Sequence, residues 1–135
     1  MFSFNYILFS SQQLHSKLNF FRKPHKQCRI LQCNPQKLGI VDRVRITTPR
    51  KPNSAKRKTV KVEYYHMIKP SVSFIPGAGH NLKKNSKVLV RGRGARDLPG
   101  VYSSCIRGKF DLQGILHKTK RRSIYGVKKP LIDKS

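Results

Sequence analysis

The sequence predicts a small all-β domain, for three reasons. Short runs rich in β-branched and aromatic residues recur along the middle of the chain, each about five residues long. Turn residues separate these runs at intervals of roughly ten residues, and no long amphipathic helix competes with them. This spacing is typical of a small antiparallel barrel or sandwich. With about five strands and a basic surface, a five-stranded oligonucleotide-binding (OB) barrel is the leading candidate.

Five runs are the predicted strands. In order along the chain they are 40–46, 59–64, 72–75, 87–91 and 101–108. Alternation places one set of apolar residues on a single side of each of the first two runs, Ile40, Val44 and Ile46 and then Val60, Val62 and Tyr64. We therefore expect these two strands to flank the proline-rich loop between them.

The strands lie in the third of four segments. We expect an N-terminal extension or transit segment at 1–20, a basic RNA-binding arm at 21–39, the OB-type barrel at 40–112 and a basic C-terminal tail at 113–135. A chain of 135 residues has room for one modest domain with tails. The apolar run within 1–20 is too short to span a bilayer. Both an organellar transit segment and an extension lying on a partner remain open.

Net charge limits the class of partner. The chain has 30 Lys and Arg residues against 5 Asp and Glu, a formal net charge of +25. An isolated globule with this charge would repel itself, so a permanent nucleic-acid partner is the leading inference. A membrane is not an expected partner, because the basic residues do not line one face of an amphipathic helix.

The most informative stretch is the loop Thr47–Lys58. Pro49 and Pro52 fix φ and remove two backbone donors, so the middle of this stretch must be a stiff, shaped loop. At its centre, Asn53 and Ser54 form a small polar tip that can approach base or sugar edges closely. Phosphate anchoring is expected from the flanking basic residues, Arg50, Lys51, Lys56, Arg57 and Lys58.

A second loop, 90–100, has a similar charge pattern. Its glycines let the backbone turn and approach a ligand, and Pro99–Gly100 fits a type II turn. Bidentate contacts to RNA phosphates are expected from Arg91, Arg93 and Arg96. Asp97 is the one acidic residue here. Two readings are open for it: a brace that pairs with Arg93 or Arg96, or a group that orients the arginines toward nucleic acid.

Catalytic motifs are not recognisable, so an enzyme is not expected. The five acidic residues are scattered and form no spaced pair, and no nucleophile–base arrangement is apparent. The glycine-rich stretch 76–82 lacks the ending of a phosphate-binding loop. We interpret it as a tight turn with His80 and Asn81 as polar tips that could contact RNA or protein.

The three cysteines form no disulfide pattern. Packed or unreactive thiols are the favoured interpretation of Cys28, Cys33 and Cys105. A metal site would require His25 to fold close to them, and the repeated Cys-x-x-Cys spacing of zinc knuckles is missing.

Six ordered blocks of the sequence resemble one known family. They are Pro35–Gly39, Thr47–Ala55, Gly79–Leu82, Asp97–Val101, Arg107–Gly108 and Tyr125–Lys128. In order and spacing they are similar to small-subunit ribosomal protein twelve of the bacterial and organellar type. The resemblance covers about Arg22 to Pro130, and the block Pro52–Ala55 is distinctive by itself.

This resemblance implies a structural constituent of the small ribosomal subunit that binds rRNA and supports codon–anticodon inspection. Carried onto this chain, Ser54 would contact the RNA that monitors the second codon position, with Asn53 beside it. Pro52 would lie near the third position, where a Mg²⁺ ion on its backbone carbonyl is one option; no metal site made of side chains and no other cofactor is implied. His80 would lie on the side that faces elongation factors. Asp97 matches an aspartate that many bacteria methylthiolate.

The implied partners are small-subunit rRNA, neighbouring ribosomal proteins, the mRNA–tRNA pair at the decoding site and elongation factors. A non-ribosomal single-stranded nucleic-acid-binding OB protein is the alternative. The N-terminal extension and the heavy Lys, Asn, Phe and Ile usage favour a mitochondrial ribosome, with a plastid or the bacterial cytoplasm as alternatives. Arg50 and Arg96 replace lysines that are usual in the family, and 65–70 matches its pattern poorly.

Overall fold

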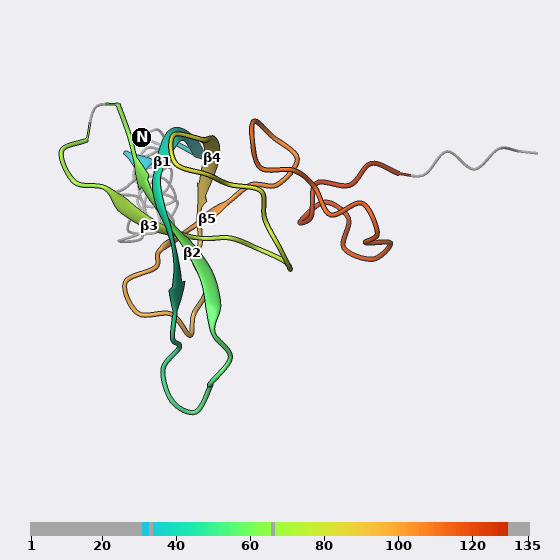
Figure 1. Ribbon diagram of the computed structural model, residues 1–135, viewed down its shortest axis with the longest axis horizontal. Helices are drawn as coiled ribbons and strands as arrows, with labels where there is room; N and C mark the ends of the chain where they lie inside the picture. Colours follow the sequence, from blue (N-terminus) through green and yellow to red (C-terminus); the bar gives the residue numbers. More distant parts are fainter. Residues whose placement is uncertain (1–30, 33, 66, 130–135) are drawn as a thin grey trace, which may run out of the picture.

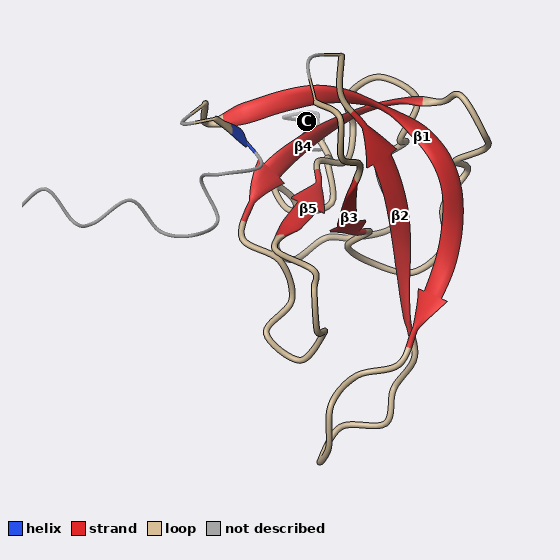
Figure 2. Cartoon of the chain, turned by 90° about the vertical axis from the view of Figure 1, so that its left-hand side faces the viewer, coloured by secondary structure: helices blue, strands red, loops and turns tan. Residues whose placement is uncertain are grey.

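The computed structural model describes residues 31–32, 34–65 and 67–129, and these form a closed β-barrel with long connecting loops (Figures 1 and 2). The strands are β1 (Gln36–Thr47), β2 (Arg57–Glu63), β3 (Ser71–Phe74), β4 (Lys87–Gly92) and β5 (Ser103–Cys105). Around the barrel they follow the order β1-β2-β3-β5-β4. The prediction of a five-stranded all-β barrel is confirmed, although β1 begins earlier and β5 is shorter than the predicted runs.

One strand pair departs from the antiparallel arrangement. Both neighbours of β1 are antiparallel to it, whereas β3 and β5 run parallel. A parallel pair needs a long crossover, and the chain between β3 and β5 supplies one by way of β4. Ser73 and Ser103 face each other in this pair, and their buried hydroxyls lie 2.7 Å apart. This hydrogen bond satisfies two polar groups inside the barrel.

Alternation along β2 builds one wall of the core. Val60, Val62 and Tyr64 are 0%, 0% and 4% exposed, so the single apolar side predicted for this run is confirmed. The Tyr64 hydroxyl lies 2.9 Å from that of Ser71, and burial raises the pKa of Tyr64. Other fully buried aliphatic residues complete this core, Val41, Val88, Val90 and Leu112.

The single apolar side predicted for the first strand is wrong. Ile40 and Ile46 are 48% and 67% exposed, whereas Val41 is fully buried and Val44 packs against the core. The pairing of β1 with β2 shifts register between Val41 and Arg43. An irregularity of this kind exchanges the inward and outward positions of a strand, so regular alternation does not describe β1.

A buried arginine joins the turn after β3 to the segment after β5. Arg107 is 5% exposed and donates hydrogen bonds to the backbone carbonyls of Pro76, Gly79 and Gln113, the last at 3.1 Å. Burial lowers the pKa of this guanidinium group. Three carbonyl oxygens replace the water that the charge loses, so no acidic partner is required. Arg107 therefore fixes two loops relative to each other.

Cys105 should be an unreactive thiol in the folded protein. It is 1% exposed, and burial raises the pKa of its thiol to about 12. Because the thiolate is the reactive form, Cys105 should resist a maleimide at about pH 8 in the native protein and react once urea unfolds it. Mass spectrometry can follow this single thiol in a Cys28→Ser/Cys33→Ser background. Rapid labelling of the native protein would contradict the buried placement.

Candidate nucleic-acid interface

The loop between β1 and β2 extends away from the barrel (Figure 2). Pro49 is buried, whereas every residue from 50 to 56 is exposed. The backbone amide of Asn53 donates to the backbone carbonyl of Arg50 at 3.0 Å, which closes a tight turn. The peptide bond before Pro52 is cis. The predicted tip is therefore a solvent-exposed turn at the far end of a stiff loop.

Asp97 connects this loop to the loop that follows β4. Its backbone carbonyl accepts a hydrogen bond from the Arg50 amide at 2.9 Å, and its carboxylate accepts one from Arg57 Nη2 at 3.0 Å. The carboxylate side chain is 15% exposed. Arg50 precedes the tip and Arg57 follows it, so Asp97 holds both sides of the loop. We call this pair of contacts the Asp97 bridge.

The pairing expected for Asp97 is wrong in its partner. The sequence suggested Arg93 or Arg96, which are its neighbours along the chain, whereas the structure pairs the carboxylate with Arg57. Forty residues separate Asp97 from Arg57. Local spacing therefore carried no signal for this contact.

The second loop is shaped by close backbone packing. A Cβ built on Gly94 would lie 2.1 Å from the Val101 carbonyl oxygen, so only glycine fits there. Gly100 has a φ of 74°, as the predicted type II turn requires. Ser104 Oγ donates to the Arg93 carbonyl at 2.7 Å. The exposed side chains of this loop that were predicted to bind rRNA are Arg91, Arg93 and Arg96.

Residues from both loops line a shared hollow of about 320 Å³. Arg50 contributes from the first loop and Arg96 from the second, with Pro99 and Tyr102 beside them. Arg50 and Arg96 therefore line the same space. The sequence alone placed them in separate loops.

Arg57 lines a larger hollow of about 640 Å³. It combines basic residues near the start of β2 with a basic residue of the tail, Lys56, Arg57, Lys58 and Arg121. Its apolar surface includes Phe74, Ile124 and Tyr125. A further hollow shares Phe74, Ile124 and Arg121 with it and adds Arg91 and Arg93. Cations from three parts of the chain thus border neighbouring hollows.

Arg121 is a candidate site residue that the sequence analysis missed. It borders both hollows, yet it lies in a tail where basic residues are abundant. Charge alone does not separate such a residue from its neighbours. Its φ of 54° marks a turn in the structure, but arginine has no sequence signal for that conformation.

His80 and Asn81 both make contacts within the protein. His80 Nδ1 accepts a hydrogen bond from the Leu82 amide at 3.3 Å. Burial lowers the pKa of His80, and the positive charges of Lys58 and Arg107 lower it further. The side-chain amide of Asn81 donates to the backbone carbonyl of Asp111 at 2.7 Å. Its side-chain oxygen accepts from the backbone amide of Gln113 at 3.2 Å. Asn81 therefore also fixes its own turn.

No group of three potential metal-binding side chains occurs in the described part of the chain, and Cys105 lies in the core. The other members of the considered metal set, His25, Cys28 and Cys33, lie outside the described residues. None of the described helical residues belongs to a helix long and apolar enough to cross a membrane.

The closed five-stranded barrel and its clustered cations define an OB-type protein with the charge of a polyanion-binding surface. The family model for ribosomal protein S12/S23 matches residues 24–131. The small ribosomal subunit protein uS12m of Paramecium tetraurelia is 57% identical over 100 residues, which cover 74% of this chain and 71% of the relative. The chain belongs to the ribosomal protein S12/S23 family, whose members are structural components and not enzymes.

The Asp97 bridge should contribute a measurable coupling energy. Asp97→Asn and Arg57→Gln should each lower the free energy of unfolding, and the double variant should lose less than their sum. We expect a coupling of about 1 kcal/mol, because the exposed part of Arg57 is screened by water. Urea unfolding of the four proteins measures it.

Asp42→Asn is the matched control for this cycle. Asp42 pairs with Lys61 at 2.9 Å on another part of the barrel. Its effect should add to that of Arg57→Gln, since the two sites share no partner. Additivity between Asp97 and Arg57 would contradict the bridge.

Proposed function

We propose that this protein binds small-subunit rRNA and supports decoding accuracy in a mitochondrial ribosome. The observation that carries the proposal is the Asp97 bridge, which joins the loop that carries the small exposed tip to the second basic loop. Phosphate contacts fix a protein's position and orientation on a nucleic acid, while hydrogen bonds to bases provide discrimination. The two loops offer the groups for both.

Within this proposal the residues divide into two sets. Phosphates of rRNA would be held by the basic residues of the two loops, Arg50, Lys51, Lys56, Arg57, Lys58, Arg91, Arg93 and Arg96. The codon–anticodon pair of mRNA and tRNA would be faced by Pro52, Asn53 and Ser54. The second set is small and uncharged, so it can approach RNA closely.

A Mg²⁺ ion at the Pro52 carbonyl is a further part of the proposal. Among the described residues no cluster of three metal-binding side chains exists. In this proposal the Pro52 carbonyl is the oxygen that the protein supplies. Mg²⁺ prefers six oxygen ligands and keeps several waters. RNA phosphate and water would complete the coordination, and the ion would be shared between protein and RNA.

The proposal also includes two protein contacts and one modification. Elongation factors would face the turn that contains His80, and neighbouring ribosomal proteins would cover other parts of the barrel. Methylthiolation of Asp97 would place a modified side chain between the two basic loops.

The location follows from the relative's name and the composition. The Paramecium relative is named as a small ribosomal subunit protein, uS12m, which supports assignment of this chain to the small subunit of a mitochondrial ribosome. A free single-stranded nucleic-acid binder of the same fold was the alternative. Membership of a ribosomal protein family favours the ribosomal role.

Sedimentation distinguishes the two roles. The protein should remain with the small subunit through a wash at about 1 M salt, because a shaped interface adds contacts beyond phosphate neutralisation. A free binder held by phosphates alone would be released as counterions compete. Quantification of this chain in washed subunits and in the supernatant measures the outcome, and recovery only in the supernatant would overturn the ribosomal proposal.

Ser54→Ala should weaken codon discrimination without preventing subunit assembly. The change removes one exposed hydroxyl at the tip, and the loss of one hydrogen bond of about 1 kcal/mol corresponds to about a fivefold change in discrimination. Reconstituted translation with cognate and near-cognate codons measures it. Ser123→Ala, a second exposed hydroxyl far from this loop in sequence, should leave accuracy unchanged. Impaired assembly with normal accuracy would argue against the proposed role of Ser54.

A further inference from the structure

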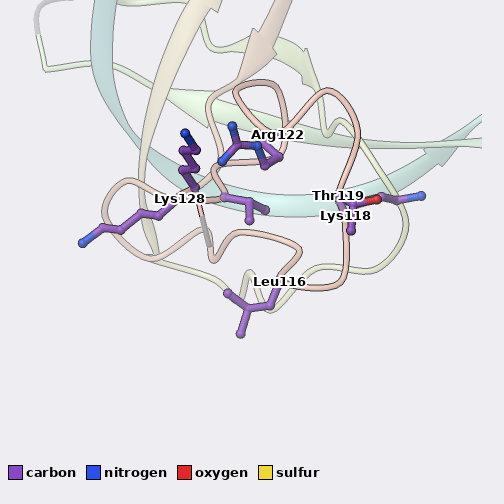
Figure 3. A pocket seen from close by; sticks show the side chains of 7 residues that line it. Leu116, Lys118, Thr119, Arg122 and Lys128 are labelled. Atoms are coloured by element: carbon purple, nitrogen blue, oxygen red, sulfur yellow. The ribbon is translucent and has the colours of Figure 1, made fainter. Parts of the chain in front are cut away.

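The C-terminal segment, residues 114–129, contains a pocket of about 400 Å³ (Figure 3). Neither basic loop contributes to this pocket. Leu116 and Val127 give it apolar surface, and Thr119 adds a hydroxyl. Four basic residues complete the lining, Lys118, Arg122, Lys128 and Lys129. The volume falls in the range of small-molecule sites.

Backbone hydrogen bonds form this pocket in advance of any ligand. The Lys118 amide donates to the Ile115 carbonyl at 3.1 Å and closes one turn, and the Val127 amide donates to the Arg122 carbonyl at 3.1 Å and closes another. The Ile115 amide donates to the Tyr125 carbonyl at 3.0 Å and joins the two turns. Ile115 is 6% exposed, so a buried side chain anchors this segment. Preorganisation of this kind lowers the entropy cost of binding.

The charge of the pocket selects an anion. None of the described residues that line it is acidic, so its positive charge is not balanced from within. Lys118 Nζ lies 5.7 Å from the centre of the Tyr125 ring, a cation–π contact that restrains this ammonium group. Four basic side chains line this one volume, and long side chains of this kind can reach one or two phosphate groups.

The aliphatic side chains further restrict the class of ligand that fits the pocket. A bare phosphate would satisfy the cations and leave Leu116, which is 86% exposed, in water. A lipid chain would cover Leu116 and Val127 and leave the cations unused. A nucleotide offers both features, because its base has a flat apolar face and its backbone carries phosphate on either side.

We propose that this pocket receives one unstacked nucleotide of an RNA strand. The base packs on Leu116 and Val127, and the adjoining phosphates contact the four basic side chains. The inference depends on the proposed function only in that RNA is the partner. It adds a site in the C-terminal segment that recognises a nucleotide taken out of its stack, separate from the loops assigned to phosphate anchoring and inspection.

Binding of two matched RNA probes tests this assignment. The probes are an octamer of adenosine and the same octamer without bases, which carry equal phosphate charge. Fluorescence anisotropy with the full-length protein should show about tenfold tighter binding of the adenosine octamer, the scale expected for burying an aliphatic side chain against a base. The double variant Leu116→Ala/Val127→Ala should reduce that ratio to near one, while the affinity for the abasic octamer stays unchanged.

Leu38→Ala is the matched control, because Leu38 is an aliphatic residue of β1 with 47% exposure. It should leave the ratio as in the wild type, and circular dichroism confirms that all variants fold. An equal affinity for both probes, or a ratio that survives in the double variant, overturns the nucleotide pocket. Binding of a polyglutamate peptide that only the double variant loses would assign the pocket to an acidic protein segment and overturn it too. Failure to bind either RNA would instead overturn the proposed RNA-binding function itself.

Discussion

The excess of positive charge is the constraint on which the rest of this structure depends. With 30 basic and 5 acidic residues, each carboxylate is a scarce group for holding the chain together. Asp97 connects two loops through Arg57, Asp42 pairs with Lys61 across β1 and β2, and Asp111 accepts the Lys87 amide at 2.6 Å. Each of these three aspartates joins separate segments. The unpaired cations are left at the surface, where a polyanion can neutralise them.

Where no carboxylate is available, backbone carbonyls accept the hydrogen bonds of a buried cation. Arg107 is held by three of them, and this arrangement joins the turn after β3 to the segment that leads into the tail. The backbone near Gly126 also packs closely against the segment after β5. A Cβ on Gly126 would lie 2.6 Å from the Arg107 carbonyl oxygen, so glycine is needed there. The C-terminal segment is therefore part of the folded unit, and its pocket has a fixed frame.

The sequence predicted what depends on local pattern and missed what depends on distant contacts. Regular alternation revealed the buried side of β2, because Val60 and Val62 lie on an uninterrupted strand. The same pattern failed for Ile40 in β1, because the register shift after Val41 changes which residues face inward. The partner of Asp97 was missed because forty residues separate it from Arg57. Arg121 was missed because one cation among many gives no signal until the fold places it beside a hollow.

In the proposed complex, charged and uncharged groups have different roles: the cations contribute to affinity for RNA, and the uncharged groups determine the position of the protein on it. Exposed cations attract RNA over long range, but they are screened by salt and tolerate many orientations. The tip of the loop between β1 and β2 and the aliphatic surface of the C-terminal pocket are uncharged. In the proposed complex, each would require a close fit with RNA. Two such sites, one on the long loop and one in the C-terminal segment, would restrict both translation and rotation of the protein on its RNA. In the proposed complex, a small barrel of high charge would take one defined orientation, because its few uncharged contacts stand on segments that scarce carboxylates and buried carbonyl contacts hold in place.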